Sequence, residues 1–343
     1  MTMTDLRRRQ YTILVACIVI VFVVVLTTML VYETTPSQAG GPETWDERTR
    51  QKVEQAYEEA RQYLASDQPA KARLILEDCV RKHPGDPMTH QLLSQAVAAE
   101  GDPRGSYEQA LKALALNRRL VGVQIWAGTL AFQLRDYDQA EQHYAEACKL
   151  APTEARYPLY LASVQLKRKK PDLDKAEFQI LKAIQLDANL SKSYAMLADV
   201  DSRRGMLSDA IRHINKALEH TDDVKEDAAY TIQKAQFLRR DNDPHAALEA
   251  VAALPDSMRH QMVAVRDLAT SYLMLSQPND AAELWADYYA KNPSDVQGAA
   301  EAGLCYHRAD KPSTAAVYLR QAQKIDPNHP TVKALAKALS DQE

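Results

Sequence analysis

The side chains best suited to bind a metal or to attack a substrate are scattered along this sequence. The 343 residues include 4 Cys and 9 His, and no two Cys form a Cys-x-x-Cys pair. Also missing are His-x-x-x-His, His-Glu-x-x-His, Gly-x-Ser-x-Gly and a glycine-rich phosphate loop, which are the spacings that bring ligands or nucleophiles together. We therefore predict that the chain is not an enzyme and binds no cofactor or metal.

Two histidines are spaced so that they share one helix face. His213 and His220 lie seven residues apart, which is close to two turns of an α-helix. A solvated polar face explains this spacing better than a metal site does. We expect both histidines to face solvent, with metal binding as the alternative.

The composition favours helices over strands. Hydrophobic residues make up 46% and charged residues 26% of the chain, while there are only 10 Gly, 4 Phe and 3 Trp. Alanine is abundant, and it costs no side-chain entropy in a helix and allows helices to approach closely. A formal net charge of -4 is unlike the basic excess of nucleic-acid binders. These features predict an all-α protein that does not bind nucleic acid.

An apolar segment near the N-terminus predicts a membrane anchor. Residues 11–32 carry no charge, and as a helix they span roughly 33 Å, enough for the hydrocarbon layer. Arg7, Arg8 and Arg9 precede the segment and acidic residues follow it. The positive-inside rule therefore places residues 1–10 in the cytoplasm and the rest of the chain outside it, in the periplasm of a bacterium. Residues 33–48 are expected to form a flexible linker.

A cleaved signal peptide is the alternative to this single-pass anchor. Ser37, Gln38 and Ala39 precede Gly40 and have the small residues that a signal peptidase site requires. The apolar segment is longer than the 7–15 residues of a usual signal-peptide core. The sequence therefore favours the uncleaved anchor.

A repeat of about 34 residues fills the remaining sequence. Each copy has a small residue that begins the apolar pattern of a helix, and a second small residue usually follows seven positions later. Small residues at helical spacing let neighbouring helices pack closely. The first small position reads Ala72, Ser106, Ala140, Ala176, Ala210, Ala246, Ala281 and Ala315.

These copies resemble the tetratricopeptide repeat family. Its first helix carries Leu-Gly or Leu-Ala with Tyr three residues later, seen here in Leu268-Ala269 with Tyr272, and its second helix ends near a proline. The closing proline recurs as Pro84, Pro152, Pro293 and Pro327. The resemblance implies a right-handed α-solenoid of about eight helical hairpins over residues 49–329. The expected repeats are 53–86, 87–120, 121–154, 155–190, 191–224, 227–259, 262–295 and 296–329, followed by a capping helix at 330–343.

Three repeats depart from the pattern. Repeat 2 has Arg118 in place of the closing proline. Repeat 4 carries a two-residue insertion in its turn, within the basic segment 167–176. Repeat 6 is the poorest match, because Lys234 stands at a small position and Pro255 interrupts the second helix. An eroded repeat explains repeat 6 better than a bend or a partner site.

The resemblance also implies that the first helices line a concave groove that binds a protein or a peptide. Apolar side chains at the groove positions would suit an amphipathic helix or an extended peptide, although the same side chains would equally well pack within the array. The candidate groove residues are Tyr57, Arg61, Met88, Gln91, Ile125, Phe132, Leu159 and Leu166.

Together these features predict a membrane-anchored scaffold that binds protein partners, in the assembly of a cell-envelope complex. Two alternatives stay open. One is an accessory subunit that presents a polysaccharide or an enzyme partner at the membrane, and the other is a structural protein that forms homo-oligomers.

Overall fold

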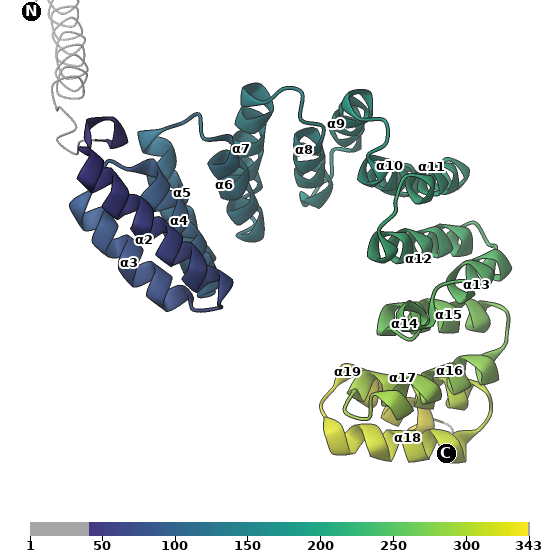
Figure 1. Ribbon diagram of the computed structural model, residues 1–343. Helices are drawn as coiled ribbons and strands as arrows, with labels where there is room; N and C mark the ends of the chain where they lie inside the picture. The colour runs from purple at the N-terminus through teal and green to yellow at the C-terminus, as the bar shows by residue number, and fades with distance from the viewer. Residues whose placement is uncertain (1–40, 342–343) are drawn as a thin grey trace, which may run out of the picture. The chain divides into compact units, whose positions relative to one another are not determined.

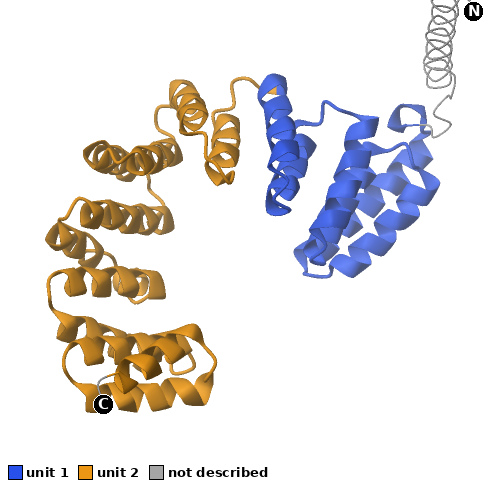
Figure 2. Cartoon of the chain, turned by 180° about the vertical axis from the view of Figure 1, so that it is seen from behind, with its two compact units in different colours: residues 1–150 blue, residues 151–343 orange. Residues whose placement is uncertain are grey.

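The computed structural model describes residues 41–341, and this part of the chain is entirely helical, with no strand. The predicted tail 1–10, the predicted membrane helix 11–32, the signal-peptide alternative and much of the linker lie outside the described residues. Within 41–341, none of the helices combines the length and the apolar composition needed to cross a bilayer. The chain divides into two compact units, residues 1–150 and 151–343, which Figure 2 colours separately.

Unit 1 consists of three helical hairpins after a short 3-10 helix at Pro42–Thr44. In Figure 1 the two helices of each hairpin lie side by side. The helices are α2 Glu47–Ala65, α3 Pro69–Lys82, α4 Pro87–Ala99, α5 Pro103–Leu116, α6 Val121–Gln133 and α7 Tyr137–Leu150.

Unit 2 consists of five further hairpins, one short helix and a terminal helix. The first helices of its hairpins are α8, α10, α12, α15 and α17. The bounds are α8 Arg156–Lys167, α9 Leu173–Leu186, α10 Ser191–Arg204, α11 Leu207–Glu219, α12 Val224–Arg240, α13 Pro244–Ala252, α14 Asp256–Arg259, α15 Met262–Met274, α16 Pro278–Lys291, α17 Val296–Arg308, α18 Pro312–Ile325 and α19 Pro330–Ser340.

The small positions of the second helices are buried in seven hairpins, where no larger side chain fits. Ala72, Ala140 and Ala176 are among those with no exposed surface. Gly128 on α6 shows the same constraint, because a Cβ atom there would lie 2.5 Å from Cε1 of Tyr144. Close approach of helix backbones is therefore the reason for the small residues.

The α12–α13 hairpin corrects the register assigned from the sequence. Ala246 is only half-buried, whereas Ala247 is fully buried, and Leu254 is buried where Ala253 is exposed. The true small position is therefore Ala247, which lies one repeat before Ala281. The shift accompanies a short second helix, since α13 ends at Ala252, just before Pro255.

Seven of the eight turns within hairpins share one backbone geometry. One turn residue has a positive φ, and the amide of the next residue donates to the carbonyl five positions earlier, as Gln68 N does to Tyr63 O at 2.8 Å. This is the Schellman arrangement that ends a helix. The positive-φ residues are Asp67, Gly101, Arg135, Gly205, Asn242, Ser276 and Asp310. The inserted turn between α8 and α9 has no positive-φ residue.

Replacing Gly205 with alanine is expected to lower the free energy of unfolding by about 1 kcal/mol. Gly205 has φ +82°, and a Cβ atom there meets no other atom within 4 Å, so the cost is backbone strain alone. The matched control is Gly122→Ala on α6, where φ is not positive and the space is also open. That control should be neutral or stabilising. Urea unfolding of the full chain in detergent measures both, and equal midpoints for the two variants would contradict the prediction.

Candidate functional site

Three of the eight candidate groove residues are core residues. Tyr57 is 8%, Leu159 2% and Leu166 8% exposed, and each belongs to a hydrophobic cluster within its unit. Their side chains are therefore not open to a partner, and for them packing within the array is the correct interpretation. Neighbouring helices cover these three positions.

Tyr57 has a structural role that its position in the sequence does not reveal. Its hydroxyl donates to Oδ2 of Asp86 and lies 3.0 Å from Oγ1 of Thr89. Asp86 is buried and caps α4 by accepting from Thr89 N at 2.8 Å. Burial, followed by the hydrogen bond to Asp86, raises the pKa of Tyr57. Tyr57 thereby joins the first hairpin to the start of the second.

The other five candidates lie on α2, α4 and α6 of unit 1. Arg61 is exposed and pairs with Glu58 on its own helix. Met88, Gln91, Ile125 and Phe132 are half-buried and define what we call the α4–α6 surface. The Trp126 side chain of α6 reaches α4, where its Nε1 donates to Ser94 Oγ at 2.8 Å.

The α4–α6 surface is formed by two helices without a charged residue. Neither α4 nor α6 contains Asp, Glu, Lys or Arg over its whole length. The half-exposed positions are thus apolar or polar without charge, and the Phe132 ring lies edge-on to Tyr137 with centroids 5.5 Å apart. A half-exposed surface depleted of charge has the composition of the centre of a protein–protein interface.

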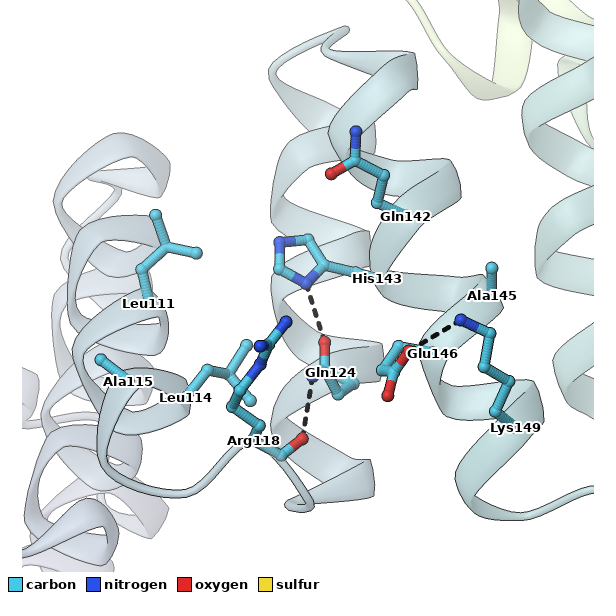
Figure 3. A pocket seen from close by; sticks show the side chains of 10 residues that line it. All are labelled: Leu111, Leu114, Ala115, Arg118, Gln124, Gln142, His143, Ala145, Glu146 and Lys149. Carbon is cyan, nitrogen blue, oxygen red and sulfur yellow. Dashed lines mark hydrogen bonds and ion pairs between the residues drawn. The ribbon is translucent and has the colours of Figure 1, made fainter. Parts of the chain in front are cut away.

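Unit 1 also has a pocket between its second helices. It has a volume of about 510 Å³ and lies between α5 and α7, with Gln124 of α6 at its base. Figure 3 shows Arg118 directed into it, beside His143. The lining residues are Leu111, Leu114, Ala115, Arg118, Gln124, Gln142, His143, Ala145, Glu146 and Lys149.

A chain of hydrogen bonds fixes the tautomer of His143. Gln124 Nε2 donates to Arg118 O at 3.0 Å, so Gln124 Oε1 accepts from His143 Nδ1 at 2.8 Å. The remaining nitrogen, Nε2, then accepts from the Tyr107 hydroxyl at 3.1 Å. Burial lowers the pKa of His143. The pocket wall is therefore uncharged at this point.

Unit 1 is expected to lose stability as the pH falls below about 6.5, the ordinary pKa of histidine. The unfolded chain binds a proton there while folded His143, with its lowered pKa, does not, so stability rises with pH across this window. His143→Gln should flatten this dependence, and His245→Gln, at an exposed site, should not. Thermal melts between pH 5 and 8 measure the effect. Parallel curves for wild type and His143→Gln would contradict it.

The same hydrogen-bond pair occurs one repeat earlier with its residues exchanged. His90 on α4 bonds Gln109 on α5 at 3.0 Å, and 34 residues later Gln124 on α6 bonds His143 on α7. In both cases the first-helix residue also bonds the carbonyl six residues before it. The signal for this pair in the sequence is the exchange of His and Gln at two positions one repeat apart, His90 with Gln124 and Gln109 with His143.

The expectation that His213 and His220 both face solvent is wrong for His213. Its Nδ1 lies 2.6 Å from Oδ2 of buried Asp201 on α10, while His220 stacks on Tyr194 with ring centroids 5.4 Å apart.

Within 41–341, no three His, Cys, Asp or Glu side chains come together as metal ligands. Cys79 and Cys305 are buried, and burial raises the pKa of both thiols, that of Cys305 to about 11.

Sequence comparison identifies tetratricopeptide repeats in two parts of the chain. The tetratricopeptide repeat model matches residues 127–190 and 266–330. None of the curated proteins matches the sequence.

Solved structures with a similar fold include one tetratricopeptide repeat protein. A tetratricopeptide repeat protein from Parabacteroides merdae is 14% identical with a TM-score of 0.52, over 84% of this chain and 99% of that one. PilF from Pseudomonas aeruginosa is 19% identical with a TM-score of 0.51, over 63% and 96%. The Cut9–Hcn1 hetero-tetramer of the APC/C contains a chain that is 17% identical with a TM-score of 0.51, over 82% and 48%. At these identities the likeness concerns the fold alone.

Proposed function

We propose that this chain, which carries tetratricopeptide repeats in its matched segments, is a membrane-anchored scaffold that binds a protein partner on the α4–α6 surface. The repeats are protein-interaction modules, and the absence of charge from α4 and α6 is the observation that selects this surface. Burying uncharged side chains avoids the desolvation cost that a charged side chain would add.

The partner segment that fits this surface is apolar and presents amide-bonding groups. Ile125 and Gln91 occupy the same position of consecutive repeats, so an apolar and an amide side chain lie on the two helices of this surface. An amphipathic helix or an extended peptide offers both kinds of contact at short intervals. Phe132, at the C-terminal end of α6, adds an aromatic contact of the kind that is enriched in interfaces.

The membrane part of the proposal is supported by residues 11–32. Their charge-free length and the preceding arginines favour a single-pass anchor with the repeats on the far side of the membrane. An anchor raises the concentration of the scaffold near membrane complexes, so weak contacts suffice. A role in assembling a cell-envelope complex follows from this placement.

Photo-crosslinking in cells tests the binding surface. p-Benzoylphenylalanine at Ile125 is expected to give a discrete adduct with one partner, and the same group at the exposed Glu108 on α5 is not. Adding Gln91→Lys should reduce the Ile125 adduct at least tenfold, because a buried unpaired charge opposes binding. Adducts of equal yield at Ile125 and Glu108 would contradict this assignment.

Reporter fusions at the C-terminus test the predicted topology separately. If the C-terminus lies outside the cytoplasm of a bacterial host, the alkaline phosphatase fusion is expected to be active and the green fluorescent protein fusion to be dark. The opposite pattern would overturn the orientation and leave the binding surface untouched.

The polysaccharide alternative has lost one of its two aromatic candidates. Stacking on a sugar needs exposed rings, and Tyr57 is buried with its hydroxyl bonded to Asp86. Of the two aromatic groove candidates, only Phe132 is half-exposed and could stack on a sugar.

A further inference from the structure

The inserted turn of unit 2 carries a concentration of positive charge. It links α8 to α9 over residues 168–172, whereas the other hairpins of the described chain turn in two or three residues. Lys167, Lys169 and Lys170 are exposed, and none of them has an ion-pair partner among the residues that the structure describes.

The carboxylates around this turn are already paired. Asp172 lies 3.2 Å from Lys175 Nζ. Asp174 and Glu177 both pair with Arg204 of α10, at 2.5 and 2.7 Å. Because these acids are engaged elsewhere, Lys169 and Lys170 of the turn and Lys167 at the end of α8 keep their charge uncompensated.

Two large apolar side chains project from the helix that follows. Phe178 is 66% exposed, the highest value among the large apolar side chains of residues 41–341, and Leu181 is 49% exposed. They lie three residues apart on α9 and therefore share a face. Phe178 lies about 9 Å along the helix axis from Asp172, which precedes α9. Lys182, four residues after Phe178, adds a basic group on this face, while Asp174, four residues before Phe178, is paired with Arg204.

We propose that these residues, the α9 patch of Lys167, Lys169, Lys170, Phe178 and Leu181, bind the surface of an anionic phospholipid bilayer. The lysines would contact lipid phosphates while Phe178 and Leu181 enter the boundary between headgroups and acyl chains. Lysine clusters beside projecting apolar side chains are complementary in charge and in polarity to such a surface.

A bilayer fits this patch better than a folded acidic protein does. Phe178 and Leu181 project from a helix into solvent, and a fluid bilayer accepts projecting side chains, whereas a folded partner would need a matching recess. The inference rests on the proposed function in one respect, since the membrane anchor would hold unit 2 near a bilayer.

Hydrogen exchange of the full chain in lipid nanodiscs tests the proposal. The amides of residues 168–170 and of Asp172 are expected to exchange at least about threefold more slowly in phosphatidylcholine discs that contain about 30% phosphatidylglycerol than in discs of phosphatidylcholine alone. Adding salt should remove the difference, because the Debye length shortens to about 3 Å at 1 M. Equal exchange in both lipids would overturn the proposal.

Variants with equal changes in net charge distinguish an effect of the α9 patch from an effect of the net charge of the protein. Lys167→Glu/Lys169→Glu/Lys170→Glu and, independently, Phe178→Ala should abolish the protection. Lys112→Glu/Lys324→Glu/Lys333→Glu, at exposed sites elsewhere, should retain it. Loss of protection in this control would overturn the assignment to the α9 patch.

Two further outcomes remain decisive. Equal protection by polyglutamate in phosphatidylcholine discs would overturn the bilayer as the ligand in favour of an acidic protein. Failure of the chain to co-purify with discs of either lipid would contradict the anchor, whereas co-purification without lipid-dependent protection would contradict only the α9 patch.

Discussion

Replacing Asp267 with alanine is expected to lower the free energy of unfolding of unit 2 by about 3–5 kcal/mol. Asp267 on α15 pairs with Arg239 Nη2 on α12, and the two side chains are only 8% and 11% exposed. Arg239 Nη1 also donates to the Asp267 carbonyl at 3.3 Å. Removing the carboxylate leaves a guanidinium buried without its counter-charge, which costs more than the ion pair itself contributes.

The pair occupies the part of the array where the repeat pattern is weakest. The corrected register moves the small position of α12 from Lys234 to the fully buried Ala235, and α13 ends early before Pro255. α12 contacts α15 directly, and Arg239 joins the two helices. The charged contact adds to the apolar packing of α13 on α15, where Val251 and Leu254 share a cluster with Leu268.

Two variants make this prediction specific. Asp256→Ala removes a surface ion pair with Arg259, in which Asp256 is 77% exposed, and should change stability by less than about 0.5 kcal/mol. The double variant Arg239→Met/Asp267→Leu should recover most of the loss, because apolar residues of similar volume often replace a buried pair without cost. Urea unfolding followed by hydrogen exchange of unit 2 peptides measures all three. Similar losses for Asp267→Ala and Asp256→Ala would refute the prediction.

Trp285→Ala is expected to destabilise unit 2 by about 3–5 kcal/mol, the usual cost of removing a large buried aromatic side chain. Trp285 on α16 is 2% exposed and meets Tyr288 edge-on, with ring centroids 5.6 Å apart. Around it lie small residues, including Ala269, Ala302 and Cys305. Their short side chains cannot fill the cavity that the indole would leave.

Phe178→Ala is the matched control for Trp285→Ala, since it also removes an aromatic ring but from an exposed position. It should change stability by less than about 0.5 kcal/mol, and Trp285→Phe should lose less than Trp285→Ala. Thermal unfolding of the full chain followed by circular dichroism gives the ranking. If Trp285→Ala unfolds at the temperature of Phe178→Ala, the assignment of Trp285 to the core is wrong.

The small residues show how far the sequence alone predicts this fold. Ala72, Ala140 and Ala315 recur at the repeat spacing, and each is fully buried. The prediction succeeds because a close helix contact excludes every larger side chain, so the constraint acts on residue type directly. It was wrong at Ala246, where the sequence offers several neighbouring alanines and only packing shows that Ala247 is the buried one.

The candidate groove residues show where prediction from sequence ends. Leu159 on α8 and Ile125 on α6 were both assigned to the groove, yet Leu159 is buried and Ile125 is half-exposed. A large apolar side chain suits the core and a binding surface equally well. Its exposure depends on the neighbouring helices, which the residue's own repeat does not encode.

The sequence by itself determined that the part of the chain described here is helical and where its helices approach most closely, because propensity and the exclusion of large side chains act locally. The tertiary structure alone decided that Tyr57 joins two hairpins, that Asp267 neutralises Arg239, and that Phe178 projects into solvent. Each of these depends on residues from different helices, whose distances are set only when the hairpins pack together.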